Sequence, residues 1–582
     1  MRRLLHNILA LSVVLLIVSA EARADKLDEF IREQMRKRHL PGLSLVIIQD
    51  GKIVKAKGYG VTKKGGKIPV TPSTLFQAGS ISKPVAAVGA LRLVDRGRLS
   101  LDEDVNTKLV TWKVPENEYM KEKKVTLRGL LSHTAGLTVH GFPGYEVGGT
   151  VPTLAQILDG EKPTNTAAIR VDVAPGSRWS YSGGGYTVMQ QLVLDVTGRA
   201  YPLYMGEAVL EPLGMNESTF EQPLPGAKAK VTATGHYQDR SLVKGRWHIY
   251  PEMAAAGLWA TPSDLARFAI GVQNAYAGKP GAVLSRQTTR EMLTKLKNNY
   301  GLGVGLNGEG RTLRFAHGGR DEGFDAMLMA YAETGQGAVI MINANDNSRM
   351  VSRILSRIAS EYGWPDFPTS VPMKHPVADV DGKTLDAYAG RYEFANNRML
   401  TFVTDRGRLF TEVDGFVDEE FVPETATRFL SAERGAQVTF TKDNNGEVNG
   451  FEWKENAEAR KVPRIGPLVR ASKLGADPDP ARTRAVEAAL KALAQGGKTV
   501  EEALGITPGA RKDFAGGTPA LAGIKSLSFV SAQDVRGRGI ERHEGKVGSV
   551  LYYKLVTEKA VRYVLIHLTA EGLVTDYDVV DN

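Results

Sequence analysis

The chain has 582 residues, which is too long for one hydrophobic core and predicts three or four domains. Its 42% hydrophobic and 24% charged residues exclude a disordered chain, and its lack of cysteine excludes disulfides, thiol catalysis and thiolate metal sites. The formal net charge of +9 is interspersed, with no basic stripe carrying aromatic residues, which argues against a nucleic-acid partner.

Residues 1–24 have the pattern of a secretory signal peptide. Arg2 and Arg3 precede an apolar run at 8–18, and Ala-Arg-Ala at 22–24 is a typical cleavage site. We therefore expect an exported protein that is periplasmic or secreted. The apolar run is short for a membrane span and no later run is long enough, so no membrane-spanning segment is expected.

The mature chain is expected to open with a helix at 25–39, which places Leu27, Ile31 and Met35 on one face. Strands at 42–48 and 52–58 follow, joined by the hairpin turn Asp50-Gly51. A third segment, 76–94 (FQAGSISKPVAAVGALRLV), contains an apolar run that predicts a buried helix with Ser80 in its first turn, ending near Gly97.

Ser80 and Lys83 lie three residues apart at the start of this apolar helix, so their side chains should share one face. Burial disfavours an ammonium, and Lys83 could then take the proton of the Ser80 hydroxyl. Ser80 could instead be a helix cap and Lys83 a surface residue. The same spacing recurs at Ser241 and Lys244 in a polar stretch with no apolar helix behind it.

The next elements carry further polar residues. His133 follows an apolar helix that begins near 125; in such a position a histidine is more often structural than catalytic. Tyr181 precedes a glycine triplet that opens another apolar helix, ending near 196. Strands are then expected at 300–306, 314–319, 326–330 and 338–343, and a helix at 349–362.

The remainder of the chain reads as two small domains. Prolines at 365, 368, 372 and 376 indicate a linker. Short alternating strands across 388–453 suggest a small antiparallel barrel. Beyond a second proline-rich linker, a helix is expected at 481–493, followed by strands at 527–530, 548–555, 561–568 and 573–579.

Several separated motifs together resemble the serine β-lactamase and penicillin-binding-protein superfamily, in its class C-like branch of S12-type peptidases and esterases. The motifs are FQAGSISKP (76–84), LLSHTAGL (130–137), PGSRWSYSGGGY (175–186), EPLGMNESTF (211–220) and HGG (317–319). The resemblance covers about 25–362. It implies an α/β (α+β) fold in which helices flank an antiparallel sheet beside an all-helical subdomain.

The resemblance also implies residue roles. Ser80 would be the nucleophile that forms an acyl-enzyme, and Lys83 and Tyr181 would share general-base duty. The backbone N–H groups of Ser80 and Arg320 would form the oxyanion hole. The expected substrate-binding residues are Ser182, Gly183, His317, Gly318, Gly319 and Arg320.

One motif departs from the family pattern, in which Tyr-x-Asn is usual. This chain has Tyr181-Ser182-Gly183, and no Tyr-x-Asn occurs elsewhere in it. In relatives the asparagine helps to hold the substrate amide and the lysine. Its replacement, together with histidine in place of the family's lysine at 317, favours esters or small acyl groups over β-lactams.

The resulting plan has six parts: signal peptide (1–24), serine hydrolase domain (25–362), linker (363–382), lipocalin-like β-barrel (383–460), linker (461–480) and a C-terminal α+β domain similar to nuclear transport factor 2 (NTF2-like; 481–582). We expect an exported serine hydrolase acting on an ester or a peptide-like amide, for example one derived from the cell wall. The alternatives are a β-lactamase or D-Ala-D-Ala carboxypeptidase, and a penicillin- or peptidoglycan-binding sensor. No cofactor and no metal are expected, since His-Glu-x-x-His is absent.

Overall fold

A computed structural model describes residues 26–367, 377–395, 398–413, 416–431, 435–455, 458–468, 476–494, 505, 507, 523–542, 545–557 and 561–580. The predicted signal peptide and three of the four linker prolines, at 368, 372 and 376, lie outside these residues. The chain divides into two compact units, Met1–Thr369 and Ser370–Asn582.

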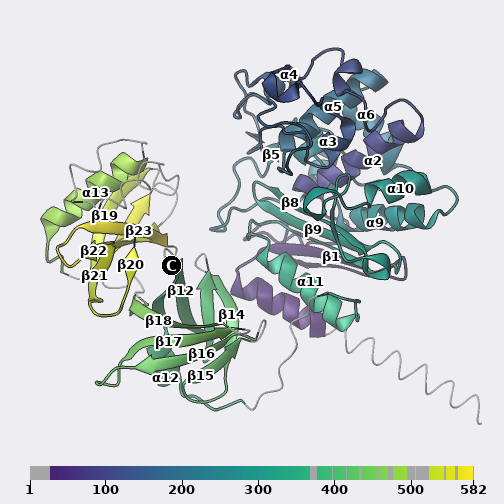
Figure 1. The fold of residues 1–582 in the computed structure, drawn as a ribbon. Helices are drawn as coiled ribbons and strands as arrows, with labels where there is room; N and C mark the ends of the chain where they lie inside the picture. Colours follow the sequence, from purple (N-terminus) through teal and green to yellow (C-terminus); the bar gives the residue numbers. More distant parts are fainter. Residues whose placement is uncertain are drawn as a thin grey trace, which may run out of the picture. The chain divides into compact units, whose positions relative to one another are not determined.

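A six-stranded antiparallel sheet, in the order β2-β1-β10-β9-β8-β7, forms the centre of the first unit (Figure 1). Residues Asp50 and Gly51, both with positive φ, make the predicted hairpin between the first two strands. The strands are β1 (Gly42–Gln49), β2 (Lys52–Gly60), β7 (Gly305–Asn307), β8 (Arg314–Asp321), β9 (Phe324–Tyr331) and β10 (Gly337–Ile342).

The sheet separates two hydrophobic cores, because successive side chains of a strand point to opposite faces. Leu45 and Ile47 of β1 pack with a helix at 26–37 and with α11 (Arg349–Glu361). Val46 and Ile48 face the larger core, which contains α2 (Ser82–Asp95) and α9 (Pro262–Ala277). Figure 1 shows α11 on one side of the sheet and α2 and α9 on the other.

Short helices and two-stranded pairs complete this unit and surround α2. The helices are α3 (Leu127–Leu131), α4 (Leu154–Asp159), α5 (Gly183–Thr197), α6 (Tyr201–Met205), α7 (Gly226–Ala229), α8 (Met253–Ala256) and α10 (Arg286–Met292). The strand pairs are β3 (Phe76–Gln77) with β6 (Trp259–Ala260), and β4 (Tyr145–Glu146) with β5 (His248–Ile249).

The strand expected at 300–306 is wrong for most of its length, since β7 covers only Gly305–Asn307. Gly303 has a φ of +93°, outside the extended region. A Cβ added there would lie 2.6 Å from the Cβ of Ala87, so the backbone packs directly against α2. The glycines at 301 and 303 therefore serve close packing rather than a regular strand.

The second unit begins with a closed eight-stranded antiparallel barrel, which confirms the predicted barrel architecture. A short helix, α12 (Gly382–Tyr388), contributes to its aromatic core, where the Tyr388 and Phe440 rings stack 4.0 Å apart. The strands are β11 (Gly390–Ala395), β12 (Arg398–Asp405), β13 (Arg408–Val413), β14 (Phe416–Pro423), β15 (Arg428–Ser431), β16 (Gln437–Lys442), β17 (Val448–Glu455) and β18 (Glu458–Pro467).

The described residues of the C-terminal part form the helix α13 (Pro480–Ala494) and an antiparallel sheet in the order β19-β21-β22-β23. A short strand, β20, pairs with β21. The strands are β19 (Ile524–Asp534), β20 (Glu541–Arg542), β21 (Gly545–Thr557), β22 (Val561–Thr569) and β23 (Val574–Val580). The helix and sheet agree with the elements expected from the sequence.

Candidate active site

Ser80 lies in a single 3-10 turn, Gly79–Ile81, which leads directly into α2. Gly79 has a φ of +53°, and a Cβ there would collide with the backbone nitrogen of Arg320. A Cβ on Gly319 would likewise collide with the carbonyl oxygen of Ala78. These two glycines let the turn press against β8, so the backbone at Ser80 and the backbone at Arg320 come together.

Lys83 is 2% exposed and its amine reaches two oxygen atoms. The Lys83 Nζ donates to Ser80 Oγ at 2.9 Å and to the carbonyl oxygen of Ala255, in α8, at 2.8 Å. The predicted pairing of hydroxyl and amine is therefore present in the structure. The neighbouring Ser82 is fully buried. Its hydroxyl donates to the carbonyl oxygen of Gly79 and accepts from the Leu258 amide, and these two bonds stabilise the turn.

The second Ser-x-x-Lys spacing has no such geometry. The Ser241 hydroxyl donates to Asp239 at 2.6 Å, and the Lys244 amine pairs with Glu146 at 2.6 Å. Both side chains lie in an exposed loop rather than at the end of a buried helix. Spacing alone therefore does not bring a serine and a lysine together; the buried helix does.

Aromatic rings surround the Lys83 amine. Its nitrogen lies 4.9 Å from the centre of the Tyr181 ring and 5.7 Å from that of Tyr186. The Tyr181 hydroxyl makes no hydrogen bond to a residue that the structure describes. Linked ring contacts of 4.3 to 6.4 Å extend this set to His133, His140, Trp179, Tyr181, Tyr186, Tyr300 and His317.

The buried imidazoles of His317 and His133 are neutral near pH 7. His317 Nδ1 lies 2.6 Å from the carbonyl oxygen of Gly318, and because a carbonyl can only accept, this nitrogen carries the proton. Burial, reinforced by the positive charge of Lys83, lowers the pKa of His317 to about 3. The same two causes hold the pKa of His133 well below its usual value.

Ser182 and Gly183 form the start of α5, and their local contacts are structural. The Ser182 hydroxyl accepts from the Gly185 amide at 2.9 Å and donates to the carbonyl oxygen of Thr138 at 2.8 Å. A Cβ on Gly183 would lie 3.0 Å from the Phe142 ring and 3.1 Å from the His140 oxygen. The space that a side chain at 183 would need is therefore already occupied.

Arg320 presents its backbone to the Ser80 turn, while its side chain is held elsewhere. Its guanidinium donates to both oxygens of Asp325, at 2.8 and 3.1 Å, and to Asn347 at 3.0 Å. Asp325 is fully buried, so this bidentate pair anchors the end of β8. The side chain is consequently not aimed at Ser80.

Residues that sequence reasoning did not assign to the site also gather here. Trp179, Tyr186 and Tyr300 belong to the ring cluster, and Ala255 supplies a carbonyl to Lys83. Trp179 and Tyr186 flank Tyr181 in one motif, which was the available signal. Ala255 is 172 residues from Lys83 and accepts through its backbone carbonyl. No residue type in the sequence could therefore have identified it as a partner of Lys83.

Among the described residues, no group of three or more His, Cys, Asp or Glu side chains could hold a metal ion. No helix in the described part of the chain is long and apolar enough to cross a membrane.

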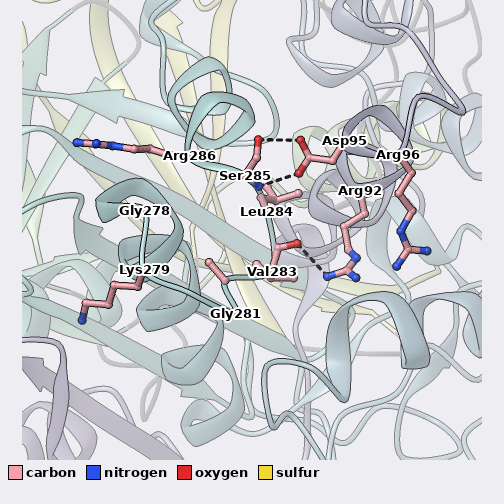
Figure 2. Close-up of a pocket in the computed structure, with 11 residues that line it drawn as sticks. Arg92, Asp95, Arg96, Gly278, Lys279, Gly281, Val283, Leu284, Ser285 and Arg286 are labelled. Atoms are coloured by element: carbon pink, nitrogen blue, oxygen red, sulfur yellow. Dashed lines mark hydrogen bonds between the residues drawn. The ribbon is translucent and has the colours of Figure 1, made fainter.

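A separate cavity of about 350 Å³ lies between the end of α2 and the start of α10 (Figure 2). Asp95 accepts from the Ser285 amide and hydroxyl, both at 2.8 Å, and thereby supports the cap of α10. Figure 2 shows Lys279 and Arg286 extending away from this pair. The basic side chains around the cavity therefore do not converge on one point.

Comparison with known proteins matches residues 27–360 to the Beta-lactamase family and 374–463 to a domain of unknown function, DUF3471. Protein flp of Staphylococcus aureus is 24% identical over 405 residues, covering 65% of this chain and 72% of that protein. Penicillin-binding protein 4* of Bacillus subtilis is 22% identical over 459 residues, covering 74% and 96%. The octameric penicillin-binding protein homologue from Pyrococcus abyssi superimposes with a TM-score of 0.52 at 23% identity, covering 75% and 99%, and shares the fold.

Proposed function

Because the chain belongs to the β-lactamase family, we propose that it is a serine hydrolase acting through an acyl-enzyme on an ester or a small peptide-like amide. The observation that carries this proposal is the buried contact of 2.9 Å between Lys83 Nζ and Ser80 Oγ. Hydrogen-bond reach between a nucleophile and its base is the first requirement of nucleophilic catalysis.

In the proposed first step, Ser80 Oγ attacks the substrate carbonyl carbon while its proton passes to the Lys83 amine. Tyr181 shares this proton through its hydroxyl, the role that the family resemblance implies; the centre of its ring lies 4.9 Å from the Lys83 amine. The backbone N–H groups of Ser80 and Arg320 stabilise the negative oxygen of the tetrahedral intermediate; one such donor typically lowers a barrier by about 2.7–4 kcal/mol.

The intermediate then collapses, the carbon–oxygen or carbon–nitrogen bond breaks, and the leaving group takes the proton held by Lys83 and Tyr181. A water molecule attacks the acyl-enzyme in the second step and gives its proton to the same pair. The carboxylic acid leaves and Ser80 regains its hydrogen, so the enzyme returns unchanged.

The neutral surroundings of Ser80 support an ester or another uncharged substrate. His317 carries no charge at neutral pH, and the Arg320 guanidinium is engaged with Asp325 and Asn347. A carboxylate on the substrate would thus lack a dedicated cation in this part of the site. The second candidate is the β-lactamase or D-Ala-D-Ala carboxypeptidase activity that the sequence resemblance implies. The name of the Bacillus relative, a penicillin-binding protein, favours β-lactam binding.

We also propose that the protein is exported to the periplasm or secreted, on the strength of the pattern at 1–24. Its substrate would then be a small molecule outside the cytoplasm, such as one derived from the cell wall. The division into hydrolase (25–362), lipocalin-like barrel (383–460) and NTF2-like domain (481–582) belongs to the same proposal, although the last barrel strand, β18, continues to Pro467 within the expected linker. N-terminal sequencing of the protein recovered from the periplasm or medium tests the cleavage after residue 24.

The activity is tested with p-nitrophenyl acetate, nitrocefin and a fluorescent penicillin. Turnover of the ester that disappears in Ser80→Ala and persists in Ser241→Ala supports the proposal, because both serines precede a lysine by three residues. Turnover of nitrocefin favours the β-lactamase alternative. Slow labelling by penicillin without turnover of any substrate indicates the sensor. Mass spectrometry should find the acyl adduct on Ser80, and its absence during turnover contradicts the mechanism.

A further inference from the structure

His133 has an unusual backbone for a buried residue with a large side chain. It lies one residue beyond the C-cap of α3 and has a φ of +60°, in the left-handed region. Glycine or asparagine normally occupies this position, since a larger side chain has a steric cost there. His133 is 2% exposed, so its ring is held inside the molecule rather than turned to solvent.

The same residue holds the backbone on both sides of Tyr181. The Ser180 amide donates to the carbonyl oxygen of His133 at 2.9 Å. The Ser182 amide donates to His133 Nδ1 at 3.1 Å. The His133 ring also lies 4.3 Å from the Tyr181 ring, centre to centre, with 37° between their planes. One side chain and its own carbonyl therefore fix Tyr181 in three ways.

The hydrogen bond to Ser182 requires a neutral imidazole with its proton on Nε2. A protonated Nδ1 would point a donor at the Ser182 N–H and break the contact. Burial and the charged or titratable groups that face the ring, Lys83, His317 and His140, all disfavour protonation. The acceptor is consequently retained across the pH range in which a hydrolase of this kind works.

We propose that His133 is a positioning residue for Tyr181, which it holds against the Lys83 amine; this inference rests on the proposed acyl-enzyme function. The Tyr181 hydroxyl makes no hydrogen bond to a described residue, so the ring contacts and the two flanking amides set where it lies. Strained backbone at such a point is explained when the side chain it carries serves the site.

The test uses substitutions that separate the backbone from the ring. His133→Gly removes the ring and suits the left-handed backbone, which offsets part of the cost of the cavity that the ring leaves. His133→Asn also tolerates this backbone, and its Oδ1 replaces Nδ1 as acceptor of the Ser182 N–H. His39→Gly is the matched control: His39 is another left-handed histidine, with a φ of +49°, just after the helix at 26–37.

We expect His133→Gly to lower kcat for the ester at least tenfold with little change in KM, because misplacing a catalytic group costs rate rather than binding. His133→Asn should recover most of this loss, and His39→Gly should keep the wild-type kcat. An unchanged kcat in His133→Gly, or equal losses in the Gly and Asn variants, overturns the inference.

Two further results separate failure of this inference from failure of the proposed function. If His133→Gly is unstable, His133→Gln replaces it, because the longer glutamine side chain has no acceptor at the Nδ1 position. Ester turnover in His133→Asn but not in His133→Gln supports the inference. Equal turnover in these two variants overturns it. If the wild type neither turns over ester nor labels at Ser80 with a fluorophosphonate, the proposed function fails and this inference fails with it.

Discussion

Glu252 offers a direct test of how the interior beside the nucleophile is charged. It immediately precedes α8, which provides the carbonyl of Ala255 to Lys83. Glu252 is fully buried, and neither carboxyl oxygen has a hydrogen-bond partner among the described residues. Burial raises the pKa of Glu252 from 4.5 to about 8. The carboxyl should therefore be protonated at neutral pH.

The sign of the resulting pH dependence follows from proton uptake. Between pH 4.5 and pH 8 the folded protein binds this proton and the unfolded chain does not, so stability falls as pH rises. Each pH unit in this window corresponds to about 1.4 kcal/mol. From pH 5 to pH 7.5 the carboxyl thus removes up to about 3 kcal/mol, and Glu252→Gln, which has no proton to lose, should remove that dependence.

The measurement is urea unfolding of the full chain at pH 5 and pH 7.5, followed by tryptophan fluorescence. Five of the six tryptophans lie in the first unit, so the signal reports mainly on the unit that contains Glu252. The difference in unfolding free energy between Glu252→Gln and wild type should shift in favour of the variant from pH 5 to pH 7.5. The same difference for Glu211→Gln, at an exposed site, should not change. A gain of under about 1 kcal/mol, or an equal gain in the control, would show that Glu252 ionises inside the fold.

Four further substitutions, two of them combined in one chain, test the site by stability and rate. Wild type should lose about 2 kcal/mol of stability between pH 6.5 and pH 5, because the unfolded chain protonates His317 and the folded protein does not. His317→Gln should abolish this loss, as measured by urea unfolding. Gly319→Ala should lower both Tm and kcat, because its Cβ would force β8 away from the carbonyl oxygen of Ala78 and widen the oxyanion hole. Gly183→Asn should destabilise the fold by about 1–3 kcal/mol through overpacking, and Phe142→Ala in the same chain should restore part of the loss, as read from Tm.

The sequence predicted the parts of the site that depend on local spacing. Ser80 and Lys83 meet because positions three apart share a helical face, and the apolar run behind them buries the amine. Their catalytic roles, like those of Tyr181 and His317, stay predictions until the variants are measured. The backbone partner Ala255 and the contacts of His133 could not be read from the sequence, since they depend on tertiary packing between distant segments.

The fold shows the same division between local and tertiary signals. The predicted strands at 326–330 and 338–343 appear as β9 and β10, because short continuous runs of apolar residues specify them locally. The segment at 300–306 has a similar apolar pattern, yet its glycines turn it into an irregular stretch against α2. A pattern of small and apolar residues fits both outcomes, and only the neighbouring helix decides between them.

The charge states around Ser80 support the proposed uncharged substrate. Burial keeps His133 and His317 neutral by lowering their pKa, and it keeps Glu252 neutral by raising its pKa. Burial also raises the pKa of Asp321 well above its usual value. The buried amine of Lys83 then acts among neutral groups, and the donors of the oxyanion hole work in a low dielectric, where they stabilise a developing negative charge most strongly. A substrate carboxylate would have to be desolvated in the same surroundings, where His317 is neutral and the Arg320 guanidinium is paired with Asp325. An ester meets no such cost until the transition state, where the oxyanion donors offset it.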